Sequence, residues 1–132
     1  NEHLQRRTKL LERLSYKDKK FIIRPLRSME DFINESNKLD HCVKTYTKRC
    51  VEGTANIFGL RKIDEPDEPY FTVNISSDGR LIENHGLHNV LPTSEVKAFV
   101  DKWLKVVTKR LEKEPIDASE KEETKQNIRI GA

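Results

Sequence analysis

The fold is decided by residues 70–85, which read YFTVNISSDGRLIENH. Aromatic and β-branched side chains alternate with polar ones through residues 70–75, and this period of two is typical of a β-strand. Asp78 and Gly79 follow, and an Asp-Gly pair supplies the positive-φ residues of a tight hairpin turn. Another such run begins at Leu81 and ends near His85. This stretch therefore predicts a β-hairpin.

The same alternation precedes the hairpin at residues 56–61, which read NIFGLR. A polar loop with two prolines, residues 64–69, separates this run from the hairpin. The three runs together predict a three-stranded antiparallel β-meander. A shorter apolar run at residues 21–23 has the composition of an edge strand, and Pro25 prevents it from continuing as a regular ladder.

Four segments have the 3.6-residue apolar period of amphipathic helices. The last of them carries an apolar stripe that includes Trp103, and we expect it to lie across the sheet. Residues 16–20 have the composition of a polar turn. The fold class predicted is α+β, a three-stranded antiparallel β-meander packed against helices, with a basic N-terminal helix and a polar C-terminal tail. The predicted helices run to about residue 15, over residues 29–37, over residues 41–51, and from residues 92–95 to a stop at Pro115.

Positive charge is concentrated at the start of the chain. The 132 residues carry a net charge of +3, whereas residues 1–27 contain nine lysines or arginines against three acids and have a net charge of +6. We therefore expect a basic helical arm at residues 1–19, an α+β domain at residues 20–112 and a polar tail at residues 113–132. A basic arm of this kind gives sequence-independent affinity for phosphates, although a solvated helix rich in lysine and arginine has the same composition. The expected nucleic-acid contacts are Arg6, Arg7, Lys9, Arg13, Lys17, Lys19, Lys20, Lys44 and Lys48.

Reactive side chains are densest in residues 39–50, which read LDHCVKTYTKRC. His41 lies near the start of a predicted helix and is suited to act as a general base near neutral pH. Cys42 falls in the first turn, where the helix dipole favours a thiolate. Each residue also has a structural interpretation: His41 as a helix cap, Cys42 as a small buried hydrophobe and Tyr46 as a packing residue.

Two further polar features complete the predicted site. The loop at residues 83–89, which reads ENHGLHN, leaves the third strand, and Arg61 closes the first. A phosphate suits arginine, histidine, tyrosine and asparagine together, although Arg61 can equally be a surface residue. The residues expected to form the catalytic site are His41, Tyr46, Arg61 and Asn89.

A metal centre is a weaker hypothesis. His85 and His88 could join His41 and a cysteine around zinc, but neither a paired Cys-x2-Cys nor a His-Glu-x2-His frame is present. We expect no metal and no cofactor. No run approaches the roughly 18 apolar residues that span a bilayer, and no signal-peptide pattern is visible. Two cysteines are few for a disulfide-dependent secreted domain, so we expect reduced cysteines, a cytoplasmic location and no membrane partner.

The chain resembles the PcfJ-like family, whose members are encoded on conjugative plasmids, phages and other mobile elements. The most specific parts of the resemblance are His41-Cys42-Val43-x2-Tyr46 and the Gly86-x2-Asn89 loop. The family pattern usually has glycine after the valine, whereas this chain has Lys44, which adds a positive charge. The resemblance covers about residues 20–108 and also includes residues 39–46, Gly53, residues 57–61, 69–73, 78–82 and 92–103.

The resemblance implies a role in plasmid transfer or phage biology, and three functions remain open. The leading hypothesis is a nucleic-acid-associated module of a mobile element, in which the basic arm contacts phosphates. The second is a nuclease or other phosphodiester hydrolase, with His41 as general base, Arg61 and Lys44 stabilising charge, and Cys42 as a weaker candidate nucleophile. The third is a protein-interaction module that docks partners of a transfer or phage-related complex.

Overall fold

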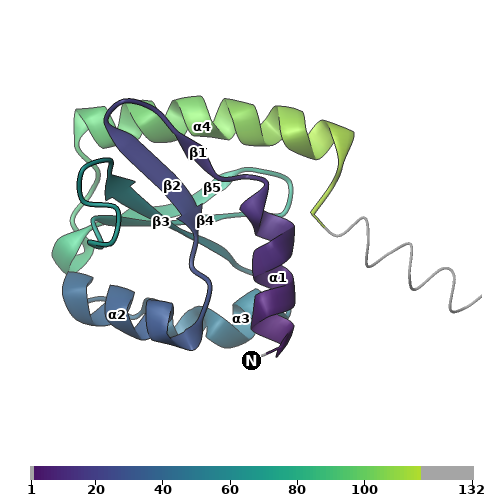
Figure 1. Cartoon of the computed structure of the whole chain (residues 1–132), viewed down its shortest axis with the longest axis horizontal. Helices are drawn as coiled ribbons and strands as arrows, with labels where there is room; N and C mark the ends of the chain where they lie inside the picture. The colour runs from purple at the N-terminus through teal and green to yellow at the C-terminus, as the bar shows by residue number, and fades with distance from the viewer. Residues whose placement is uncertain (1, 117–132) are drawn as a thin grey trace, which may run out of the picture.

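The computed structural model describes residues 2–116, which form one antiparallel sheet of five strands in the order β1-β2-β3-β4-β5. Helix α4 lies across one face of the sheet, and α2 and α3 lie on the opposite side (Figure 1). Helix α1 stands at one end, between the two helical layers. The elements are α1 (Glu2–Glu12), β1 (Tyr16–Lys17), β2 (Phe21–Pro25), α2 (Met29–Leu39), η1 (Val43–Tyr46), α3 (Thr47–Val51), β3 (Asn56–Lys62), β4 (Phe71–Ile75), β5 (Leu81–His85), η2 (Leu87–Asn89) and α4 (Ser94–Lys113).

The α+β class is confirmed, but the predicted number of three strands is wrong. The predicted meander is β3-β4-β5, and β2 pairs along β3 from Phe21↔Lys62 to Pro25↔Phe58. The predicted polar turn at residues 16–20 contains β1, which pairs with Ile22 and Ile23 only. Strand β2 is therefore second in the sheet instead of its edge, and Pro25 lies beyond the stretch that β1 covers. Two-residue β1 is too short to show an alternating pattern.

One face of the sheet forms the main core against α4. The alternation predicted in β3 and β4 places Phe58, Leu60 and Val73 on this face. Trp103 of α4 is fully buried there, and the centroid of its ring lies 4.9 Å from that of the Phe58 ring. Its indole N–H donates to the carbonyl of Leu14 at 2.7 Å. The predicted apolar stripe of α4 is thus confirmed, and it fixes the helix on the sheet. Its buried members are Val96, Phe99, Val100, Trp103, Val107 and Leu111.

The opposite face of the sheet is polar, which is unusual for a surface that helices cover. Pairing places Thr72 beside Gly59 and His85, and Asn74 beside Glu83, all on the side of α2 and η1. Only a small second core, built around Phe32 and Ile57, packs there. The candidate site lies on this polar face.

The segment expected to be a basic arm is packed into the domain. Leu4 of α1 belongs to the small core on the polar side, whereas Leu11 and Leu14 belong to the main core. The helix ends at Glu12 instead of about residue 15. The N-terminal segment therefore packs against both hydrophobic cores.

The helix predicted at residues 41–51 is divided. Asp40 adopts a left-handed conformation with φ 51° and ends α2, and the chain then forms η1 and the short α3. Cys42 consequently precedes a 3-10 turn, not the first turn of an α-helix. At the other end, α4 ends at Lys113, and Ile116 is buried in the main core. The rest of the expected polar tail, residues 117–132, lies outside the described residues.

Candidate functional site

A pocket of about 250 Å³ opens on the polar face of the sheet. Strands β3, β4 and β5 form its floor, and the segment from His41 to Tyr46 forms a wall. Three of the four predicted site residues, His41, Tyr46 and Asn89, line it together, although they are far apart in the sequence. The lining consists of His41, Cys42, Val43, Tyr46, Ile57, Thr72, Asn74, Glu83, His85 and Asn89.

The fourth predicted residue, Arg61, is not at the pocket, so the prediction that it holds an anion beside His41 is wrong. Its guanidinium binds the carboxylate of Glu35 through two contacts, of 3.1 and 2.5 Å. The carboxylate side chain is completely buried, and Arg61 is 8% exposed. Two parallel N–H···O bonds satisfy both charges, so Arg61 is committed to the interior.

The bare backbone of Gly59 makes room for this ion pair. A Cβ at residue 59 would lie 2.7 Å from the Nη2 atom of Arg61, closer than side chains pack. Arg61 and Gly59 share the polar face of β3, and Arg61 lines a separate hollow together with Arg24 and Asn34. The absence of a side chain at residue 59 thus lets the guanidinium lie flat and reach α2.

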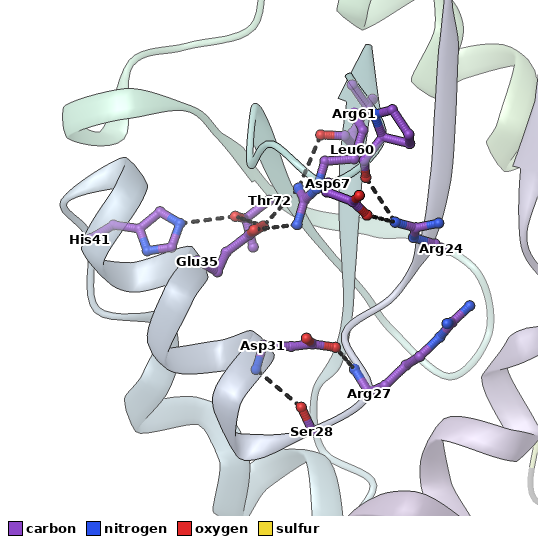
Figure 2. Close-up of polar contacts among 11 residues, drawn as sticks. Arg24, Arg27, Ser28, Asp31, Glu35, His41, Leu60, Arg61, Asp67 and Thr72 are labelled. Carbon is purple, nitrogen blue, oxygen red and sulfur yellow. Dashed lines mark hydrogen bonds and ion pairs between the residues drawn. The ribbon is translucent and has the colours of Figure 1, made fainter. Parts of the chain in front are cut away.

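Glu35 connects this ion pair to the pocket, as Figure 2 shows. The hydroxyl of Thr72 donates to Glu35 at 2.9 Å. The Nε2 atom of His41 lies 2.9 Å from the same hydroxyl oxygen. A continuous chain of polar contacts therefore runs from buried Arg61 through Glu35 and Thr72 to the half-buried imidazole of His41.

The contacts of this chain fix the tautomer of His41. The hydroxyl group of Thr72 uses its one proton in the hydrogen bond to Glu35. Nε2 of His41 must therefore donate to the hydroxyl oxygen. The backbone N–H of Val43 donates to Nδ1 at 3.4 Å, which agrees with an unprotonated Nδ1. Nδ1 therefore carries the basic lone pair of His41, and the only donor to it within residues 2–116 is distant.

Tyr46 faces a carboxylate across the pocket. Its hydroxyl donates to the two oxygens of Glu83 at 3.1 and 3.4 Å. Burial, followed by the negative charge of Glu83, raises the pKa of Tyr46 above its ordinary value. The guanidinium carbon of Arg49 lies 4.8 Å from the centroid of the tyrosine ring. Tyr46 therefore remains a protonated donor near neutral pH, and its ring is held from outside the pocket.

The loop after β5 places Asn89 at the mouth of the pocket. His88 and Asn89 both have left-handed backbones, with φ of 53° and 61°, and asparagine tolerates this conformation well. Nδ1 of His88 lies 2.9 Å from a carboxylate oxygen of Asp40, so the loop is tied to the end of α2. A Cβ at Gly86 would lie 2.9 Å from the ring of Phe71. Close packing against β4 thus sets the path of the loop.

The two cysteines have different environments. Cys42 is exposed and lines the pocket, which contradicts its interpretation as a buried hydrophobe. Cys50 is buried, and this burial raises the pKa of its thiol to about 11. Within residues 2–116 there is no group of three or more histidine, cysteine or acidic side chains that could hold a metal ion.

The residues predicted to contact nucleic acid lie in two separate parts of the fold, and one of them, Arg7, is excluded. Arg7 is buried and donates to Asn56 at 3.1 Å, so it cannot meet a phosphate without unfolding of its surroundings, and this expected contact is wrong. Lys44 is exposed on η1, within the wall of the pocket, and Lys48 is exposed on α3, which follows it. The others lie on α1 and around β1, where Lys20 pairs with Glu95 and Arg13 donates to backbone carbonyls of α4 and its end. Arg6, Lys9, Lys17 and Lys19 are exposed.

The sequence predictions missed Glu35, Thr72 and Asn74, and they included Glu83 only as the first residue of the polar loop at residues 83–89. The alternation of β4 already placed Thr72 and Asn74 on one face of the strand, and this signal could have identified them. Glu35 had no such signal, because an acidic residue in a short amphipathic helix usually faces solvent. Its partner Arg61 is 26 residues away in the sequence.

One family model, described as PcfJ-like protein, matches residues 1–101, which is most of the chain. No curated protein and no solved structure matches it. Within residues 2–116, each helix is too short or too polar to cross a membrane.

Proposed function

The chain belongs to the PcfJ-like family, and we propose that it is a nucleic-acid-binding module that engages an unpaired strand. Exposed cations bind the phosphate backbone, and one group of the strand enters the pocket of His41, Tyr46 and Asn89. The setting is a mobile genetic element, in plasmid transfer or phage biology, as the family resemblance implies.

The observation that carries this proposal is the separation of charge around the pocket. None of the ten lining residues is a lysine or arginine, and Glu83 is the one acid among them. Lys44 is instead exposed on the wall that also supplies Tyr46, and Lys48 and Arg49 are exposed on α3, which follows that wall in the chain. A negatively charged phosphate is favoured outside the pocket and an uncharged, hydrogen-bonding group inside it. An unpaired nucleotide has this arrangement of charge, because its phosphate and base are separated by the sugar.

Fluorescence anisotropy with single-stranded and duplex oligonucleotides, across a range of salt concentrations, tests the proposal. We expect the single strand to bind more tightly, and affinity to fall as salt rises. Lys44→Gln with Lys48→Gln removes two exposed cations from η1 and α3, and the salt dependence should become shallower by about 0.7 per lost phosphate contact. Lys97→Gln on α4, on the other face of the sheet, is the matched control. Absence of binding at low salt would refute the proposal.

A second candidate function is hydrolysis of a phosphodiester, with His41 as general base. The observation that favours it is the chain from Arg61 through Glu35 and Thr72 to His41, which holds the imidazole in one tautomer with Nδ1 unprotonated. Since Arg61 is committed to Glu35, Lys44 is the cation left near this histidine to stabilise charge. Cleavage of a labelled oligonucleotide by the wild type and by His41→Ala tests this candidate, and equal rates would remove His41 from it.

A further inference from the structure

Asn74 places an unused hydrogen-bond donor in the pocket. The residue is 2% exposed, and its Oδ1 atom accepts the backbone N–H of Asn56 at 3.1 Å. Because an N–H group can only donate, this contact fixes which end of the side-chain amide is oxygen. The amide nitrogen, Nδ2, is buried and has no partner among the described residues. Buried polar groups are nearly always satisfied. Since Asn74 lines the pocket, a ligand bound there is the candidate partner for this N–H.

A matching acceptor lies next to Asn74. Glu83 is directly opposite Asn74 in the β4-β5 ladder, on the same face of the sheet. Side chains in such a pair start about 5 Å apart and can contact one ligand together. The carboxylate receives a hydrogen bond from Tyr46, and a carboxylate has about four acceptor positions, so it has capacity for ligand donors. The pocket floor thus offers a donor beside an acceptor.

The volume of the pocket and the charges of its lining residues restrict the class of ligand further. The volume of about 250 Å³ is below the range for drug-sized molecules, so the pocket suits one small ring system. The single carboxylate and the absence of lysine and arginine from the lining disfavour an anion. The required ligand is a neutral group that has an acceptor next to one or more N–H donors.

We propose that the pocket binds an unpaired guanine by its Watson–Crick edge, with Asn74 donating to O6 and Glu83 accepting from N1–H and N2–H. This inference rests on the proposed function, since it names the group that enters the pocket. Guanine offers one acceptor and two adjacent N–H donors, and so satisfies Asn74 and both oxygens of Glu83. On the Watson–Crick edge, adenine offers one acceptor and one amine, and cytosine offers two acceptors and one amine. Either base therefore leaves one oxygen of the carboxylate without a ligand donor.

Oligonucleotides that are abasic at every position except a central one, which carries a single base, test the inference. We expect guanine to bind at least about tenfold more tightly than adenine, because the loss of a base-specific hydrogen bond has an effect of this size. A matched control base is 1-methylguanine, in which a methyl group replaces the N1 proton on the Watson–Crick edge, and it should lose the same preference. The fully abasic oligonucleotide reports the phosphate contacts alone.

Two variants locate the effect. Asn74→Asp keeps the oxygen that accepts from Asn56 and removes the N–H donor, and Glu83→Gln keeps the size of the side chain and removes its charge. Both should reduce the preference for guanine over adenine at least about fivefold. Melting curves report whether they fold, and the 1-methylguanine comparison on the wild type decides the question if they do not. Equal affinity for guanine, 1-methylguanine and the abasic strand would overturn this inference alone, whereas no binding of any oligonucleotide at low salt would overturn the proposed function as well.

Discussion

Glu35→Gln removes the negative charge at the centre of the chain that runs from Arg61 to His41. The Glu35 side chain is 0% exposed and that of Arg61 is 9% exposed, so solvent cannot replace the lost carboxylate. Breaking a buried ion pair by removing one partner costs about 3–5 kcal/mol. Glutamine keeps one oxygen that can accept from Arg61 or Thr72, which places the expected loss of unfolding free energy near the lower end, at about 3 kcal/mol.

Urea unfolding followed by fluorescence measures this loss. The single tryptophan, Trp103, is fully buried, so its emission reports global unfolding. A double-mutant cycle with Arg61→Met isolates the pair, because the double variant buries no charge at this position. We expect the sum of the losses of unfolding free energy in the two single variants to exceed the loss in the double variant by about 2 kcal/mol or more. A loss below about 1 kcal/mol for Glu35→Gln, or additive losses in the cycle, would refute the assignment of a buried ion pair.

Three further predictions concern residues near the site. Gly59→Ala should destabilise the fold by about 1–3 kcal/mol through its clash with Arg61, and less in an Arg61→Met background; equal losses in urea unfolding would contradict this packing. A thiol-specific reagent at pH 8 should modify Cys42 quickly and Cys50 only after denaturation, and rapid modification of both would contradict the burial of Cys50. Burial raises the pKa of the Cys50 thiol from 9.0 to about 11. As the pH rises, the thiol therefore ionises in the unfolded state before it ionises in the folded state. The contribution of Cys50 to stability is present below pH 9 and is lost as the pH rises to about 11. Unfolding free energies should show this alkaline loss, up to about 3 kcal/mol, in the wild type, and Cys50→Ala should lose less stability over the same pH range.

The elements with a long or strict pattern could be predicted from the sequence. Helix α4 has a stripe of apolar residues over about four turns, and the Asp78-Gly79 hairpin fixes the register of its strands. Strand β1 could not be predicted, because two residues show no period and its pairing with β2 depends on the rest of the sheet. The helix at residues 41–51 was predicted too long, because residues 43–46 form a 3-10 turn and the α-helix begins only at Thr47.

The site could be predicted in part. His41, Tyr46 and Asn89 were identified by their types and do meet at one pocket. Arg61 was assigned to the wrong partner, because the sequence shows a charge at the end of a strand but not which face α2 covers. The same missing information concealed Glu35, whose burial depends on an arginine on a distant strand. Local patterns thus identified three residues that line one pocket, whereas the contacts that orient them are set by tertiary packing.

Binding at the pocket is the central claim, and amide chemical shifts of the isotope-labelled protein test it most directly. A single-stranded oligonucleotide is added at low salt, and the backbone amides that move are mapped on the structure. We predict that the largest shifts cluster at His41, Tyr46, Asn74, Glu83 and Asn89, with smaller ones at Lys44 and Lys48. Shifts confined to α4 on the opposite face, or no shifts at all, would contradict the claim.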